Sequence, residues 1–196
     1  MATMLYQGHG SLRLVTDGGK VIYVDPFAGE GYDAAADLIL VTHQHHDHNC
    51  IDLPKKAPGC VIFQNFDAWK DGEYQVLELD FGKVEAVPAY NHHHRKEECV
   101  GYIVTVDGLS VYFAGDTGRT EEMSDMAGRH LSYAVLPMDA TYTMDVEEAI
   151  DCAERIGARY TIPVHMAPGK LFDPERAKRF QVRGARIMTP GESIRL

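Results

Sequence analysis

The order of hydrophobic and polar positions along the chain predicts strands and hairpins with a few helices. Residues 11–16 alternate in polarity, residues 21–24 are apolar, and the intervening residues 17–20 (DGGK) predict a tight turn between two strands. Residues 37–41 form an apolar segment of strand length, which is typical of burial on both faces. Similar patterns predict further strands at residues 61–63, 74–79, 83–87, 99–106, 109–113, 133–136, 160–164 and about 186–188.

Three helices are predicted in the second half of the chain. Thr120 is expected to cap a helix that runs through Met126. Asp145 caps a second helix, in which apolar residues recur at helical spacing until Gly157 ends it. A last helix begins at Pro174, after an aspartate suited to the cap position. By itself, this order of elements indicates a mixed α and β protein.

Residues 42–48 (THQHHDH) concentrate metal-binding groups directly after a buried strand. Residues two apart in an extended loop point the same way, so His43 and His45 can bind one cation as neutral imidazoles. After a turn, Asp47 and His48 can face a second cation beside the first. Two cations about 3.5 to 4 Å apart form the binuclear centre of many hydrolases.

Three later segments supply candidates to complete such a centre. A catalytic zinc usually takes three protein ligands, so one histidine of residues 92–94 is expected beside His43 and His45, although spacing alone does not choose among them. Asp116 follows a glycine at a strand end, where its carboxylate can approach closely enough to bridge two cations. His165 ends the strand at 160–164 and would supply the second cation's remaining imidazole.

The pattern T-H-x-H-x-D-H after a hydrophobic strand resembles the signature of the metallo-β-lactamase superfamily. Residues 90–94 followed by 100–102, then 113–117, then 162–165, fit the same family order. Residues 8–11 (GHGS) and 25–27 (DPF) resemble the branch containing L-ascorbate-6-phosphate lactonase-like and N-acylphosphatidylethanolamine phospholipase D-like hydrolases. The resemblance implies an α/β fold, the αββα sandwich, in which two β-sheets are flanked by helices.

The resemblance also implies a binuclear metal-dependent hydrolase, in which a metal-bridged hydroxide cleaves a small-molecule ester, lactone or phosphodiester. The two divalent ions would be Zn2+, with Mn2+ or Fe as alternatives. Asp47 and Asp116 would be the catalytic carboxylates, since Asp47 orients the hydroxide and Asp116 bridges the ions. The implied metal ligands are His43, His45, Asp47, His48, His94, Asp116 and His165.

The third ligand of the first ion is chosen by comparison with related proteins. They carry Ala-Tyr-Asn, a variable stretch, His-Pro-Lys and then Gly-Tyr, and counting back from Gly101 places His94 on that segment. Arg95 stands where the proline is usual, and His92 remains the alternative.

Four further residues are candidates for contacts around the metals or with the substrate. His9, between two glycines, is expected to contact a metal ligand or the substrate rather than bind metal. Asp25 can orient a metal-bound histidine by accepting its other N–H, or can simply belong to the turn before Pro26. Asp139 and Tyr142 lie in a loop that could line a pocket.

Composition suits one globular domain, residues 1–196, and a small-molecule substrate. The chain has 196 residues, of which 45% are hydrophobic, enough for a sizeable core. Asp and Glu number 29 against 19 Lys and Arg, and the formal charge is −10. Because no basic run occurs, binding to a nucleic-acid backbone is not expected.

Localisation is expected to be cytoplasmic. The first ten residues lack a signal-peptide pattern, and no stretch reaches transmembrane length. The four irregularly spaced cysteines are expected to be reduced thiols: Cys50, Cys60, Cys99 and Cys152.

Three other functions on the same fold remain open at this point. One is an iron-dependent enzyme acting on oxygen or persulfide, although His45 stands where di-iron members carry a glutamate. A metal-dependent nuclease and a non-catalytic binding protein are the others. The sequence leaves the substrate, the metal and the oligomeric state open.

Overall fold

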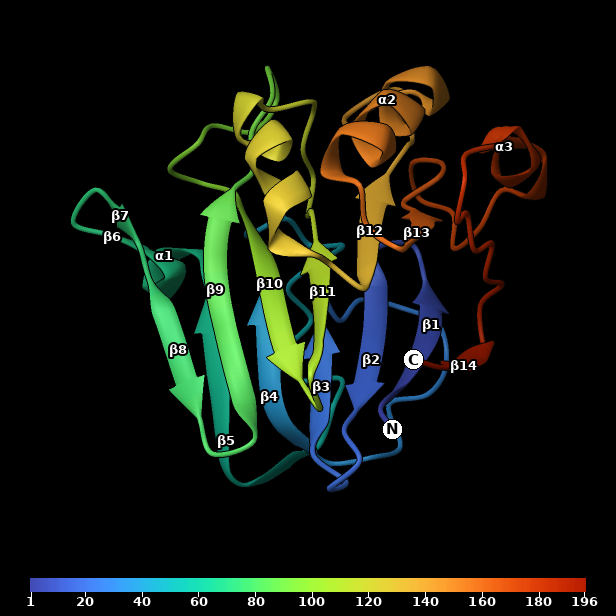
Figure 1. The fold of residues 1–196 in the computed structure, drawn as a ribbon. Coiled ribbons are helices and arrows are strands. Elements are labelled where there is room, and N and C mark those ends of the chain that lie inside the picture. Colours follow the sequence, from blue (N-terminus) through green and yellow to red (C-terminus); the bar gives the residue numbers. More distant parts are fainter.

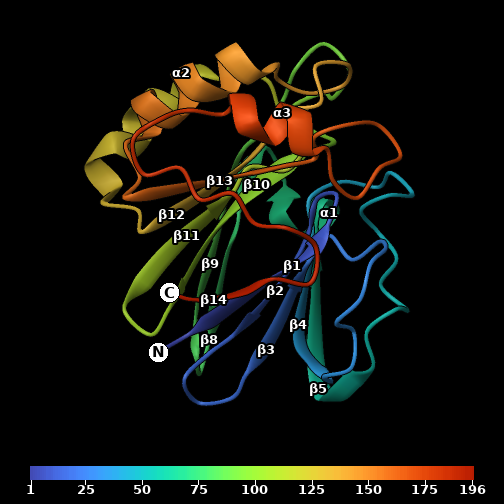
Figure 2. The ribbon, with the colours of Figure 1, turned by 90° about the vertical axis from the view of Figure 1, so that its right-hand side faces the viewer.

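Two six-stranded sheets packed face to face dominate the computed structural model, which describes residues 1–196 (Figures 1 and 2). The first sheet has the order β14-β1-β2-β3-β4-β5, formed by Ser193–Arg195, Thr3–Gly8, Ser11–Val15, Val21–Val24, Ala36–Val41 and Lys56–Gln64. The second has the order β13-β12-β11-β10-β9-β8, formed by Tyr160–Val164, Tyr133–Pro137, Leu109–Phe113, Val100–Val106, Gly82–Pro88 and Val76–Leu79.

The remaining elements are short. A small hairpin pairs β6 (Trp69–Lys70) with β7 (Glu73–Tyr74). The helices are α1 (Asn65–Ala68), the 3₁₀ helix η1 (Glu121–Arg129), α2 (Val146–Ile156) and α3 (Pro174–Arg179).

Alternation along the strands builds the core between the sheets. On β4, Leu38 and Leu40 face inward and pack in one cluster with residues of the second sheet such as Phe113. Ile39 and Val41 point to the opposite face of the same strand and belong to a separate cluster. This strand is therefore buried on both faces, as its continuous hydrophobicity predicts.

The two outer faces are covered differently. Residues of η1, α2 and α3, such as Met126, Ala149 and Ala177, pack on the outer face of the second sheet against Tyr112 and Leu136. The outer face of the first sheet is covered by loop residues instead: Tyr32, Ala34 and Ile51. The predicted α/β architecture with two packed sheets is confirmed, and its helical layer lies on one side (Figure 2).

The prediction for the second helix is confirmed, and that for the first needs correction. Asp145 Oδ1 accepts a hydrogen bond from Glu148 N at the start of α2, and Gly157 ends it with φ 64°. The segment after Thr120 is a 3₁₀ helix, and the Thr120 side chain makes no capping bond. Only Met123 and Met126 of this segment are buried, and residues three apart align on one face of a 3₁₀ helix.

The prediction of a strand at residues 186–188 is wrong. Ala185 forms only an isolated bridge with Thr161, and the terminal strand is β14, which pairs with β1 at the edge of the other sheet. Met188 is buried in the core between the sheets as the chain crosses to that edge. β1, in which Met4 and Tyr6 face the core, is absent from the predicted strands.

No helix combines the length and apolar character needed to cross a membrane. All four cysteines are free thiols in the structure.

Candidate metal centre

The candidate residues gather at one end of the two sheets, the upper end in Figure 1. β3 and β4 run parallel, and so do β11, β12 and β13, so the loops after these strands meet at a common edge. The loop after β1 and the loop after β9 reach the same place. These connections carry His9, Asp25, His43, His45, Asp47, His48, His94, Asp116, Asp139 and His165.

One cluster joins His43, His45, His94 and Asp116, whose donor atoms all lie within 4.8 Å of one another. His94 Nε2 is 3.3 Å from His45 Nδ1 and 3.7 Å from Asp116 Oδ2. His43 Nε2 is 3.8 Å from the same Asp116 oxygen. His94 is buried whereas His92 is exposed, so the structure brings His94 rather than His92 to this cluster.

A second cluster joins His9, Asp47, His48 and His165 within the same 4.8 Å limit. Asp116 lies between the two clusters, since its Oδ1 is 3.4 Å from His48 Nε2 and its Oδ2 is 3.4 Å from His165 Nε2. All seven predicted metal ligands therefore converge, and Asp116 contacts both groups.

Neighbouring side chains determine which ring nitrogen faces the centre. Thr42 Oγ1 donates to Asp25 Oδ2 at 2.7 Å, so it can only accept from His43 Nδ1, 3.0 Å away. Asn91 Oδ1 accepts from His94 Nδ1 at 3.1 Å. In both rings Nδ1 therefore carries the proton, and Nε2 presents its lone pair to the centre.

The buried imidazoles of His48 and His165 each have a carboxylate beside Nδ1. His48 Nδ1 donates to Asp25 Oδ2 at 2.9 Å, and His165 Nδ1 lies 3.3 Å from Asp139 Oδ2. Metal-binding histidines usually have such an acceptor at the second nitrogen, because it fixes the ring and raises its basicity.

Several buried atoms that face the centre have no hydrogen-bond partner within the protein. Each such atom costs about 1–3 kcal/mol when it stays unsatisfied, so a cluster of them indicates a binding site for a ligand. A mixed set of imidazole and carboxylate donors suits zinc, manganese or iron. The unpartnered atoms include His43 Nε2, His48 Nε2, His165 Nε2 and Asp116 Oδ1.

His9 has an acceptor on each side of its ring. Nδ1 lies 3.0 Å from the Lys170 carbonyl oxygen, which can only accept, so Nδ1 carries a proton. Nε2 lies 3.0 Å from Asp47 Oδ2. With its N–H at Nδ1, a neutral His9 ring presents the Nε2 lone pair towards Asp47 Oδ2, an arrangement suited to a cation between the two groups. His9 thus contacts Asp47, as expected, and also stands among the donors of the second cluster.

Burial and nearby charges move the pKa values of the two clusters in different directions. Burial and the neighbouring histidines hold the pKa of His43 well below its usual value, and burial lowers that of His94. Burial also disfavours charge on His48, but Asp116 and Asp25 outweigh it and raise the pKa to about 9. The pKa of Asp47 is lowered, because contacts with His9 and His48 outweigh its burial. Asp47 is therefore ionised and available as a hard ligand.

Strained backbone surrounds the centre. His9, Asp25 and His165 adopt the left-handed conformation, with φ of 55°, 47° and 46°. Such conformations in non-glycine residues cost about 1–3 kcal/mol each and are retained where the surroundings impose them, often at functional sites.

Residues 3–165 match the family model of the beta-lactamase superfamily domain. The chain belongs to the metallo-β-lactamase superfamily. It is 30% identical to a UPF0173 metal-dependent hydrolase of Geobacillus thermodenitrificans, in an alignment that covers 97% of this chain and 98% of the relative. The predicted family is thus confirmed, and the chain is a metal-dependent hydrolase of this superfamily.

Two solved structures share this fold. A protein of Parabacteroides distasonis, proposed to be a metal-dependent hydrolase, is 33% identical, with a TM-score of 0.78 over 95% of this chain and 92% of that one. Igni18, a metallo hydrolase from Ignicoccus hospitalis, is 24% identical, with a TM-score of 0.78 over 98% and 97%. The second likeness shows the superfamily fold alone.

The remaining two candidates, Asp139 and Tyr142, lie at different places around the two clusters. Asp139 is fully buried, and its Oδ1 accepts from the backbone N–H groups of Thr141, Tyr142 and Thr143, which leaves Oδ2 to face His165. Tyr142 is 47% exposed and lies at an opening of about 300 Å³ that also borders Asp47 and His165. Asp139 therefore contacts His165 inside the protein, and Tyr142 borders the opening.

Three residues with roles at the centre are absent from the sequence predictions. Thr42 and Asn91 orient His43 and His94, and an asparagine three residues before a candidate ligand is a local signal that could have identified Asn91. Arg176 of α3 donates to the carbonyls of Met138, Asp139 and Met166 and so holds together the loops around His165. No local pattern indicates Arg176, because these partners are far apart in the chain.

We expect Gly115→Ala to destabilise the protein by about 1–3 kcal/mol. Gly115 has φ 64°, and an added Cβ would lie 2.9 Å from Thr42 Cβ and 3.0 Å from the Val100 carbonyl oxygen. Urea unfolding measures the change. Gly128→Ala is the control, because nothing lies within 4 Å of its Cβ position and its φ is not positive. Equal stability of the two variants would contradict the strain assigned to Gly115.

Proposed function

We propose that this superfamily member is a binuclear hydrolase that cleaves a small-molecule ester, lactone or phosphodiester. Its two divalent ions, most simply Zn2+, would be held by His43, His45 and His94 on one side and by Asp47, His48 and His165 on the other. Asp116 would bind both. The observation that carries the proposal is the set of unpartnered buried nitrogen and oxygen atoms directed at the space around Asp116.

The protein's own residues prepare this chemistry. When bound, two divalent ions would lower the pKa of a water molecule towards neutrality and stabilise charge on the attacked carbonyl or phosphoryl group. Asp47 is 22% exposed at the opening, and its Oδ2 contacts His9, so its position suits orientation of the attacking water. The residues lining the two openings beside the centre include no serine or cysteine, which supports direct attack by water.

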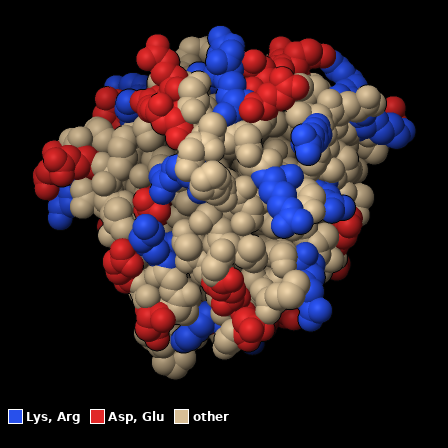
Figure 3. Space-filling model, in the orientation of Figure 1, with Lys and Arg blue, Asp and Glu red and all other residues tan.

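The surface supports a small-molecule substrate. On the face shown in Figure 3, Lys and Arg are interspersed with Asp and Glu rather than gathered into one basic patch. The net charge of −10 also argues against a nucleic-acid substrate, since binding to nucleic acid depends on many phosphate contacts with basic residues.

The direct test is elemental analysis of protein purified without added metal, followed by assay on lactones, phosphodiesters and acyl amides. Two zinc or manganese ions per chain and turnover of one of these classes are the expected results. One iron per chain would favour the oxygen-dependent alternative. No bound metal after reconstitution would contradict the proposal.

His94→Ala is expected to lower metal occupancy and to reduce activity at least 100-fold, because the first ion would lose one of its three imidazoles. His92→Ala is the matched control, since this neighbouring histidine is exposed and lies outside both clusters. Metal content and kcat/KM are measured for both. If His92→Ala caused the greater loss, the assignment of His94 would be wrong.

A further inference from the structure

A cavity of about 340 Å³ opens beside the first cluster and is lined by polar residues alone. It shares three histidines with that cluster, so a substrate whose reacting bond lies at the metals would extend a substituent into it. No apolar, lysine or arginine side chain lines it. Its lining residues are His43, Gln44, His45, Asn65, His93, His94 and Glu98.

One backbone carbonyl determines how the amides of this cavity are oriented. Asn65 Nδ2 lies 3.0 Å from the Glu98 carbonyl oxygen, which can only accept, so the Asn65 amide has one possible orientation. Asn65 Oδ1 then accepts from Gln44 Nε2 at 2.8 Å, and Gln44 Nε2 also donates to Gln64 Oε1 at 3.2 Å. Gln44 Oε1 in turn accepts from Asn49 Nδ2 at 3.2 Å.

This chain of bonds leaves the cavity with more free acceptors than donors. Both N–H groups of Gln44 are used, while the amide oxygens of Gln44 and Asn65 each keep a lone pair. The Glu98 carboxylate adds another acceptor. The remaining donors are one N–H each of Asn65, His93 and His45, fewer than the lone pairs that Glu98 and the two amide oxygens offer. A substituent with O–H or N–H groups would therefore be matched better than one that only accepts.

Glu98 is the one acidic side chain that lines the cavity, and no lysine or arginine lines it. The hydrogen bond from Arg95 lowers the pKa of Glu98, so this carboxylate is ionised, and Arg95 itself does not line the cavity. The nearby Lys96 is held by Glu122, 2.7 Å away. A phosphate or carboxylate substituent would meet the Glu98 carboxylate, and no lysine or arginine of the lining would pair with it, so only the proposed ions would attract it. An ammonium group would in turn be repelled by two divalent ions in the adjacent clusters.

We infer that this cavity is a specificity pocket for an uncharged, hydrogen-bond-donating substituent of the substrate, such as a hydroxyl or an amide N–H. The inference rests on the proposed hydrolytic function. It narrows the substrate class to hydroxylated or amide-bearing esters and lactones, in preference to substrates with a phosphate in this position.

The test uses the metal-loaded enzyme and four γ-butyrolactones that differ at one ring carbon, each offered also as its open methyl ester. The substituents are hydrogen, hydroxyl, methoxy and carboxylate. We expect kcat/KM to be about tenfold higher for hydroxyl than for methoxy, because methoxy lacks the donor, and lowest for carboxylate. Equal values for hydroxyl and methoxy, or fastest turnover of the carboxylate, would overturn the inference. Failure to cleave any ester or lactone would instead contradict the proposed function for carbonyl substrates, and the inference with it.

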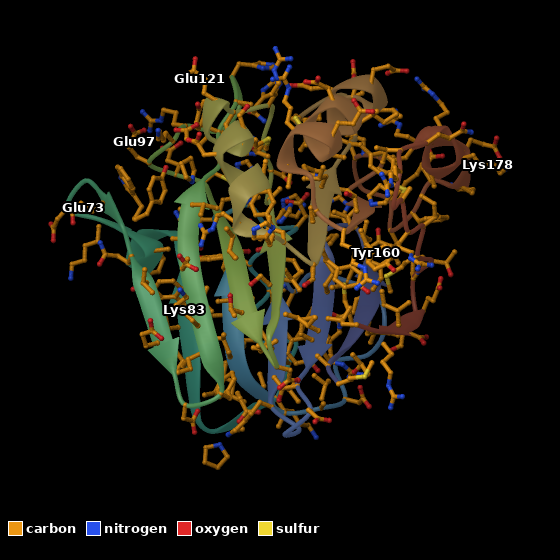
Figure 4. All side chains as sticks on the ribbon, in the orientation of Figure 1. Glu73, Lys83, Glu97, Glu121, Tyr160 and Lys178 are labelled. Carbon is orange, nitrogen blue, oxygen red and sulfur yellow. The ribbon has the colours of Figure 1, made fainter.

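Two variants test whether the substrate preference arises in this cavity. Gln44→Leu, at an exposed position, is expected to reduce the hydroxyl-to-methoxy ratio through KM while metal content stays unchanged. Glu98→Gln is expected to raise turnover of the carboxylate several-fold relative to the hydroxyl compound. Glu97→Gln is the matched control, because Glu97 lies at the periphery and does not line the cavity (Figure 4). Unchanged ratios in both Gln44→Leu and Glu98→Gln would overturn the assignment.

Discussion

Asp116→Ala is expected to remove at least one metal ion and to lower hydrolytic activity about 1000-fold while the fold is retained. Asp116 contacts both clusters, at 3.7 Å from His94 Nε2 in the first and 3.4 Å from His48 Nε2 in the second, so its loss would affect both ions. Metal ions contribute several kcal/mol of charge stabilisation in hydrolysis, which corresponds to this fold-change. Elemental analysis, kcat and urea unfolding measure the three effects.

Asp125→Ala is the control for Asp116→Ala, since Asp125 is an exposed aspartate of η1 outside both clusters. It is expected to keep the metal content and kcat of the unmodified protein. Full activity and two bound ions in Asp116→Ala would contradict a bridging role for this carboxylate.

Asp25→Ala is expected to destabilise the protein by about 3 kcal/mol and to weaken binding of the second ion about 10- to 100-fold. The Asp25 carboxylate is 2% exposed and accepts from Thr42 N at 2.8 Å, Thr42 Oγ1 at 2.7 Å and His48 Nδ1 at 2.9 Å. Alanine would leave these buried donors unpaired and would free the His48 ring. Urea unfolding and competition with a chelator measure the two effects.

Asp25→Asn separates the two roles of this residue. Asparagine tolerates the φ of 47° and can still accept from Thr42 N, so a smaller loss of stability is expected. Its NH₂ group cannot replace the second carboxylate oxygen as the acceptor for His48, so metal binding should remain weak. Asp52→Ala, at an exposed surface ion pair with Lys56, is the control and is expected to change stability by less than about 1 kcal/mol. Equal metal affinity in Asp25→Ala and Asp52→Ala would contradict the support assigned to Asp25.

Elements whose pattern is local and strong were predictable from the sequence. Residues 109–113 and 160–164 form β11 and β13 with the expected bounds, because apolar runs of this length end at clear turns or at a polar residue. α2 likewise has its expected cap at Asp145 and its end at Gly157. The terminal strand was mislocated, because a local pattern does not say which sheet edge offers unpaired backbone groups.

The sequence by itself determined the mixed α and β class and the histidine-rich loop after β4, because each depends on residues close together in the chain. Its resemblance to the superfamily implied the two-sheet fold. The resemblance favoured His94 over His92, and only the tertiary structure showed that His94 lies beside His43 and His45 and that Asp139 and Asn91 contact His165 and His94. The polar cavity lined in part by Asn65 could also be identified only from the tertiary structure. These partners come from strands of two different sheets, and they meet only because the sheets pack with their ligand-bearing ends at one edge.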